Sequence, residues 1–224
     1  MIGGQLNFGN MRSYLLSSKI LITTQTLIKS PPMSQPFLWQ SLLPFGSIDS
    51  HYLDAVHLED LESIRLWRES QIAILRQNKP ISQEEQLRYW QEIAFVEIAQ
   101  NPPKQILFAY RSKQTLIGYG GFVHIDWSQS SAELSSLLST SFPEPSETFY
   151  ALTRSYIELS LDLAKAVGLK ELTAQCYDFR LNFMERLESI GFEKVGYKIR
   201  AKSIEANASL PSFWAGAWLF SIQL

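Results

Sequence analysis

The stretch TLIGYGGFVHIDWSQSSAELSSLL, residues 115–138, decides the fold, because it holds two strand-like segments around a short polar turn. Residues 115–127 are rich in β-branched and aromatic side chains, which favour a strand. The sequence SQSS at 128–131 is a turn signal, and residues 133–138 form a second apolar segment. The stretch therefore predicts a β-hairpin.

Side-chain alternation along this hairpin predicts which residues face each other. Phe122, His124 and Asp126 fall on one face of the first strand, and Glu133 and Ser135 on one face of the second. If the four-residue turn sets the register, Asp126 lies opposite Glu133 and His124 opposite Ser135. Two adjacent carboxylates would raise one pKa toward neutrality, as a general base requires. A one-residue slip would reverse the faces.

Each of these residues also has a purely structural interpretation. Asp126 and Glu133 would serve equally well as solubilising charges beside an exposed hairpin tip, and His124 as a hydrogen-bonded structural imidazole. The cluster Gly118–Gly121 lies inside a strand and not between a strand and a helix, so it indicates a bulge or a close backbone approach more than a phosphate-binding loop.

The segments on either side of the hairpin predict one α+β (mixed α/β) domain, with a largely antiparallel sheet flanked by helices. Ser82 and Glu85 form a capping box at one helix start, and Gly168 and Gly191 occupy helix ends. The expected helices are 57–69, 82–100, 146–167 and 181–189, and the expected further strands are 106–111, 172–177, 195–204 and 213–224.

Composition limits the classes of function. The 224 residues are 46% hydrophobic and carry a formal net charge of −2, which gives no electrostatic reason to expect a nucleic-acid partner. Cys176 is the single cysteine, so an intramolecular disulfide and a cysteine-based zinc site are excluded, and no ligand spacing indicates another metal. No run reaches the length of a membrane span. A cytoplasmic protein without a metal or a membrane partner is expected.

Residues 1–48 differ in kind from the remainder, because they contain no Asp or Glu. The Ser/Thr content resembles a transit peptide, whereas Pro31, Pro32 and the later methionines Met11 and Met33 suit a misassigned start or a flexible tail. We therefore expect an N-terminal extension over 1–48 and a single domain over 49–224.

Four segments in the same order resemble the GNAT superfamily of acetyl-CoA-dependent N-acetyltransferases, over roughly residues 53–224. They are TLIGYGGFVHIDW (115–127), SAELSSLL (131–138), AKAVGLKELTAQCYD (164–178) and ERLESIGFEKVGYKIR (185–200). The last is most similar to the branches that acetylate ribosomal proteins and amino sugars. The resemblance implies a GNAT fold and acetyl transfer from acetyl-CoA to a primary amine by direct attack, without a metal.

The resemblance also implies a site for CoA between the strands at 131–138 and 172–177. Carried over by position, backbone groups of Leu137, Leu138 and Ser139 would hold the pantetheine, and amides of Ser146, Glu147 and Thr148 would meet the diphosphate. Asn182 lies two residues beyond the place where the family often has an asparagine, which is Arg180 here.

The span 139–148 departs from the family, which usually carries a loop of the form Q/R-x-x-G-x-G/A here. It has no arginine or glycine, and Pro143 and Pro145 lack amide donors. Glu144 and Glu147 place negative charge where a diphosphate would approach. The alternative to an enzyme is therefore a degenerate GNAT-fold binding or interaction module.

Candidate catalytic residues follow from the same comparison. Glu133 is the best candidate for the general base, with His124 and Asp126 near it. Leu187 stands where many members have a tyrosine that protonates the thiolate, and Tyr177 could replace that tyrosine or simply pack.

The acceptor could be an amino sugar, a protein or peptide N-terminus, or a small polyamine, and the resemblance slightly favours amino sugars.

Residues 213–224 form an internal last strand, or an edge strand that pairs in a homodimer.

Overall fold

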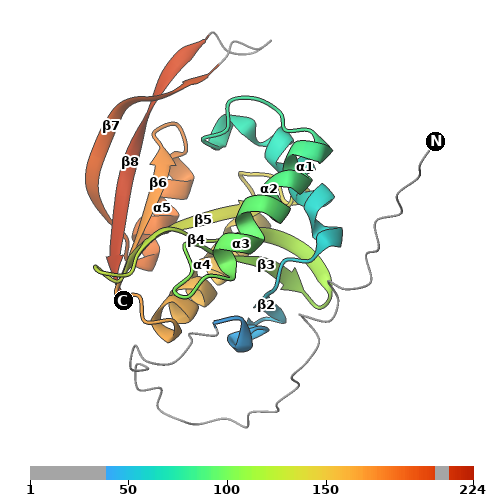
Figure 1. Cartoon of the computed structure of the whole chain (residues 1–224). Coiled ribbons are helices and arrows are strands. Elements are labelled where there is room, and N and C mark those ends of the chain that lie inside the picture. Colours follow the sequence, from blue (N-terminus) through green and yellow to red (C-terminus); the bar gives the residue numbers. More distant parts are fainter. Residues whose placement is uncertain (1–38, 205–211) are drawn as a thin grey trace, which may run out of the picture.

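The computed structural model describes residues 39–204 and 212–224, which form one eight-stranded sheet with helices on both faces (Figure 1). The strand order is β1-β2-β3-β4-β5-β6-β8-β7, and every neighbouring pair is antiparallel except β5 and β6. The predicted α+β class is confirmed. The strands are β1 (Phe45–Ile48), β2 (His51–Asp54), β3 (Ile106–Ser112), β4 (Thr115–Asp126), β5 (Ser131–Leu138), β6 (Glu171–Tyr177), β7 (Glu193–Ile204) and β8 (Phe213–Gln223).

One face of the sheet is covered by α4 (Glu147–Ala166) and α5 (Leu181–Ile190), which bury Phe108 and Phe122 of the sheet beneath Tyr156 and Leu163. A Cβ built on Gly120 would lie 2.1 Å from the Ser135 carbonyl oxygen and 2.3 Å from the Tyr156 hydroxyl. The glycine cluster of β4 is therefore the close approach that the sequence predicts.

The opposite face is covered by α1 (Leu61–Ser70) and by a second helix that begins at the Ser82 capping box. That helix comprises α2 (Gln83–Tyr89), a π-helical turn (Trp90–Ala94) and α3 (Phe95–Ile98). Trp67, Trp90 and Tyr119 form the centre of this smaller core.

Residues 71–82 join α1 to α2 and are here called the α1–α2 linker. They include the 3₁₀ turn η5 (Ile72–Ile74). The linker is tied to the sheet by Lys202 of β7, whose ammonium donates to the carbonyls of Ile72, Leu75 and Gln77, the last at 2.8 Å. Burial lowers the pKa of Lys202.

The structure adds elements that the sequence patterns did not predict. The strands β1 and β2 are joined by a tight turn in which Asp49 and Ser50 have positive φ angles, and β2 pairs with β3. Two further 3₁₀ turns are η3 (Trp39–Leu42) and η4 (Leu58–Asp60). Trp39 is buried in the main core, so residues 39–48 of the predicted extension pack on the domain. Residues 1–38 lie outside the described part.

Candidate active site

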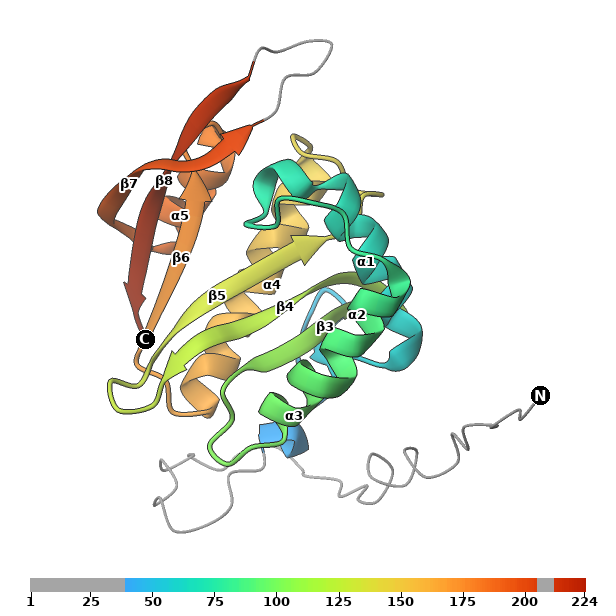
Figure 2. The ribbon, with the colours of Figure 1, turned by 45° about the horizontal axis from the view of Figure 1, so that its top comes forward.

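A gap opens between β5 and β6, because these parallel strands pair only at their beginnings. Residues 131–133 of β5 pair with residues 171–173 of β6, and the two strands then diverge (Figure 2). A pocket of about 270 Å³ lies at this divergence, and both strands line it, together with α5 and the α1–α2 linker. A gap is therefore present between the two strands where the resemblance implies a site for CoA.

The backbone of β5 presents polar groups to this gap. The Ser139 amide donates to Ile117 of the β4 side at 2.9 Å, and alternation along an antiparallel ladder turns the groups of Leu134, Ser136 and Leu138 toward β6. The Leu138 carbonyl accepts from the Gln71 side chain at 2.8 Å. Of the three predicted pantetheine-binding residues, Leu138 thus faces the gap, and Leu137 places its side chain in the pocket wall.

Glu133 stands at the last paired position, where the two strands part. Its carboxylate accepts a hydrogen bond from Arg76 of the α1–α2 linker, and the same Arg76 nitrogen donates to the Gln175 side chain of β6 at 3.0 Å. Arg76 therefore bridges the two strands at the narrow end of the gap.

The predicted register of the hairpin is wrong. Glu133 pairs with Val123 and Asp126 pairs with Ser131, because a β-bulge lies between Val123 and Asp126, at which His124 has a φ of 53°. The bulge adds one extra residue to β4 only, so simple alternation fails across it.

Asp126 is therefore not the carboxylate neighbour of Glu133. It lies at the hairpin tip, where its carboxylate accepts from the Ser128 hydroxyl at 2.6 Å and from the amides of Ser128 and Gln129. These hydrogen bonds, the hydroxyl's foremost, lower the pKa of Asp126, which is the opposite of the predicted shift. The exposed His124 imidazole lies 3.5 Å from an Arg76 nitrogen.

Tyr177, at the end of β6, lines the same pocket as Glu133, and burial raises the pKa of its hydroxyl. Leu187 of α5 lines the pocket as well, where the family often has a tyrosine. Because a raised pKa keeps the phenol protonated at neutral pH, Tyr177 is suited to give a proton and not to take one.

At the wide end of the gap, Arg180 at the start of α5 donates to Glu144 of the 139–148 loop at 2.7 Å. The Arg180 guanidinium also stacks on the Phe183 ring, 4.1 Å from its centroid. The negative charge that Glu144 brings to the loop is therefore offset by an arginine from elsewhere in the chain.

The remaining predicted CoA-binding residues surround this end. The Ser146 hydroxyl caps α4 by accepting from the Phe149 amide at 3.1 Å. Glu147 and Thr148 follow in the first helical turn, where the backbone amides lack intrahelical partners, and both side chains are exposed. Asn182 is exposed on the first turn of α5.

Residues 53–207 match the family model described as an acetyltransferase (GNAT) domain. The chain belongs to the GNAT acetyltransferase family. It is thus an acyltransferase that uses acetyl-CoA as its co-substrate, and the residues around the gap fit that molecule, with β5 backbone groups turned inward and a cation at the wide end. No curated protein matches the sequence significantly.

Solved GNAT structures share the fold at low sequence identity. The spermidine N-acetyltransferase from Vibrio cholerae, in complex with CoA and spermine, is 17% identical with a TM-score of 0.64, and the match covers 78% of this chain and 95% of that one. A putative acetyltransferase from Salmonella typhimurium with acetyl-CoA is 12% identical with a TM-score of 0.59, over 78% and 94%. At these identities the likeness shows the fold alone.

Sequence patterns missed Arg76, Gln175 and the role of Arg180. Arg76 lies 57 residues from Glu133 in an aperiodic linker, so no local signal joined them. The absent glycine-rich loop had indicated weakened binding of the diphosphate, and nothing in the sequence pattern pointed to the pairing of Arg180 with Glu144.

Within the described residues, no group of three or more His, Cys, Asp or Glu side chains could hold a metal ion. No helix in residues 39–204 or 212–224 is long and apolar enough to cross a membrane.

Proposed function

We propose that the protein transfers the acetyl group of acetyl-CoA to a primary amine by direct attack in the pocket between β5 and β6, with Glu133 as the general base. One observation carries the proposal: the strands part immediately beyond Glu133, so that its carboxylate stands at the narrow end of the pocket. Its side chain is 23% exposed, and Glu133 is among the residues that line the pocket.

The proposed reaction balances without a metal. Glu133 takes a proton from the ammonium, the free amine attacks the thioester carbonyl carbon, and a C–N bond forms as the C–S bond breaks. Tyr177 protonates the departing thiolate and recovers a proton from the attacking nitrogen, and the proton on Glu133 passes to water. A positioned base of this kind contributes about 10²- to 10⁴-fold to the rate.

The proposed CoA site uses the inward-facing backbone of Leu134, Ser136 and Leu138 for the pantetheine. Amides at Glu147 and Thr148 and the guanidinium of Arg180 would meet the diphosphate, because helix N-termini and arginines both favour phosphate. Leu137, Ser139, Ser146 and Asn182 border this path.

Isothermal titration with acetyl-CoA tests the proposal, followed by a thiol-release assay with primary amines. We expect saturable binding and amine-dependent release of CoA. Absence of binding at millimolar acetyl-CoA would refute the proposal and favour the alternative of a binding module. Light scattering tests the predicted homodimer. The homodimer, the cytoplasmic setting and the preference for amino sugars as acceptors stay predictions.

A further inference from the structure

The wall of the pocket that the acceptor must enter carries more positive than negative charge. Three guanidinium groups line the pocket, those of Arg68, Arg76 and Arg180, against the single carboxylate of Glu133. Arg180 is neutralised by Glu144. Among the described residues, no carboxylate pairs with Arg68, whose side chain donates to Gln77 at 3.0 Å. An acceptor carrying only positive charge would therefore meet repulsion here.

Arg76 is the pocket arginine placed to exchange partners. Its side chain is 49% exposed and contacts Glu133 and Gln175 at the gap and the exposed His124 of β4. An exposed ion pair of this kind contributes little to stability, so its exchange for another anion is a small change in free energy.

We propose, building on the function proposed above, that the acceptor is an amino acid-like molecule with an anionic group one or two carbons from its amine, and that Arg76 binds this anion in exchange for Glu133. The side chains of Arg76 and Glu133 are in direct contact. If the acceptor's anion binds Arg76 while its ammonium lies beside Glu133, these two groups of the acceptor must be similarly close together. A carboxylate matches the planar guanidinium in two parallel hydrogen bonds.

The exchange couples recognition to proton transfer. Before the acceptor binds, Arg76 is hydrogen-bonded to the Glu133 carboxylate. When the acceptor anion takes Arg76, Glu133 is released beside the acceptor ammonium and accepts its proton. The amine then attacks the thioester as described above. An acceptor without the anion leaves Glu133 bound to Arg76 and is acetylated slowly.

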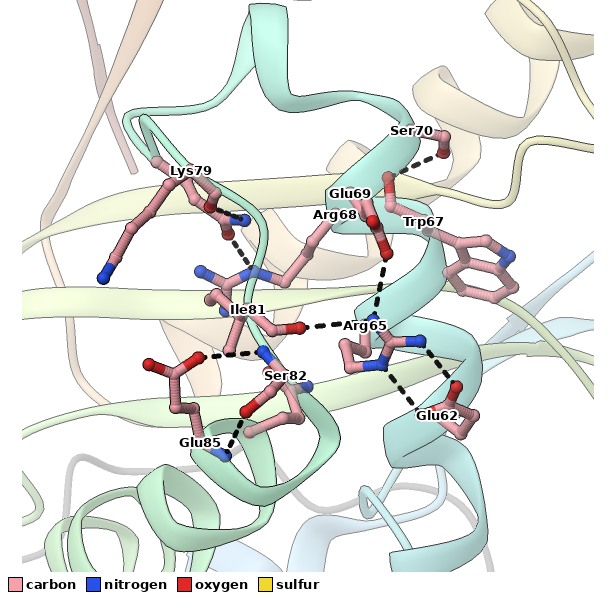
Figure 3. Close-up of polar contacts among 12 residues, drawn as sticks. Glu62, Arg65, Trp67, Arg68, Glu69, Ser70, Lys79, Ile81, Ser82 and Glu85 are labelled. Atoms are coloured by element: carbon pink, nitrogen blue, oxygen red, sulfur yellow. Dashed lines mark hydrogen bonds and ion pairs between the residues drawn. The ribbon is translucent and has the colours of Figure 1, made fainter.

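The α1–α2 linker that presents Arg76 is fixed by contacts on two sides, of which Figure 3 shows those with α1 and with the start of α2. Arg65 of α1 is held by Glu62 and Glu69 and donates to the Ile81 carbonyl at 3.2 Å. The Ser82 capping box follows directly, and Lys202 holds the opposite side of the linker. The arginine head can thus exchange partners while its backbone stays in place.

This geometry separates the acceptor classes. Polyamines carry no anion and would face Arg68 and Arg76. A protein N-terminus has an uncharged amide where an amino acid has its carboxylate, and a simple amino sugar has no anion near its amine. Of the acceptor classes compared, a free amino acid or its phosphonate or sulfonate analogue supplies both groups at the required spacing.

A thiol-release assay with the full-length protein tests the proposal. The acceptors are α- and β-amino acids, each compared with its own amide, together with 6-aminohexanoate and spermidine. We expect kcat/KM at least about tenfold higher for the amino acids than for their amides, which corresponds to about 1.4 kcal/mol. Equal use of acid and amide, or a preference for spermidine, would overturn the proposal even if acetylation itself occurs.

The variant Arg76→Gln should lose this preference, because the amino acids fall about tenfold or more in kcat/KM while the amides, for which Glu133 is no longer held by Arg76, stay level or rise. Arg88→Gln, which removes an exposed α2 arginine paired with Glu84, is the matched control and should retain it. A uniform loss for acid and amide in R76Q would contradict the role of Arg76. If R76Q does not fold, the ratio of kcat/KM between amino acids and their amides in the wild-type protein still tests the proposed acceptor class. If no amine releases CoA, it is the proposed function that fails.

Discussion

The two ends of the gap between β5 and β6 each hold an arginine–carboxylate pair, and the two pairs differ in how tightly they are held. At the narrow end, Arg76 is 49% exposed and pairs with Glu133. At the wide end, the Arg180 side chain is only 12% exposed, pairs with Glu144 and stacks on Phe183. The open pair suits exchange with a substrate, whereas the enclosed pair suits a fixed position beside CoA. Substitutions at each end test this difference.

The largest expected effect is at the narrow end. Glu133→Gln keeps the shape of the side chain but removes the proton acceptor, so kcat should fall by about 100-fold or more. Acetyl-CoA affinity, measured by isothermal titration, should stay unchanged because the variant leaves the wide end intact. Unaltered turnover would remove Glu133 from the mechanism.

Substitution at the wide end should affect affinity instead. Arg180→Ala removes the cation and leaves Glu144 unpaired, so the Kd for acetyl-CoA should rise about tenfold or more. Glu144→Gln is the matched variant; it frees Arg180 and should leave the Kd unchanged or lower. If R180A binds acetyl-CoA as tightly as the parent protein does, the diphosphate does not use this arginine.

Tyr177 lies on β6, across the gap from Glu133 of β5, and Tyr177→Phe tests the proton donor in place of the base. Loss of the proton donor should lower kcat about tenfold, a moderate effect because water can also protonate a thiolate. Since burial raises the pKa of Tyr177, the phenol stays protonated as pH rises, and the parent enzyme should lose no activity through this group between about pH 6 and 9. A profile of kcat against pH for the parent and for Tyr177→Phe measures this. A fall in kcat between about pH 6 and 9 that occurs in the parent and is absent from the variant would contradict the prediction.

The smallest effect is expected at Asp126, which the predicted register had placed opposite Glu133. Asp126→Asn should change kcat by less than about twofold, because the carboxylate contacts only the hairpin turn. Steady-state kinetics beside E133Q measure the difference directly. A large loss in D126N would mean that the bulge at His124 does not persist in solution.

Most of the fold followed from local sequence signals. The helices at 61–70, 83–98, 147–166 and 181–190 and the strands from 106 onward lie close to their predicted ranges, because periodicity, capping residues and terminal glycines act locally. The strands β1 and β2 escaped notice because each has four residues and their turn, at Asp49 and Ser50, lacks the usual glycine.

The site was less predictable, for reasons that are physical. Glu133 could be singled out from its strand, but its partner Arg76 comes from a linker whose position depends on Lys202, 126 residues farther along the chain than Arg76. The bulge at His124 depends on a positive φ in a non-glycine residue, for which the sequence has no signal. Long-range contacts of this kind need the folded chain.

The attachment of the α1–α2 linker to β7 has a thermodynamic consequence. Three carbonyls of the linker share the one buried ammonium of Lys202, so the backbone that carries Arg76 is already ordered in the free protein. Fixing a backbone residue costs about 1–2 kcal/mol of conformational entropy, and here that loss occurs when the chain folds and not when a substrate binds. If Arg76 selects the acceptor as proposed, loosening the hold of Lys202 in β7 on the linker would broaden the range of accepted amines well before the domain unfolds.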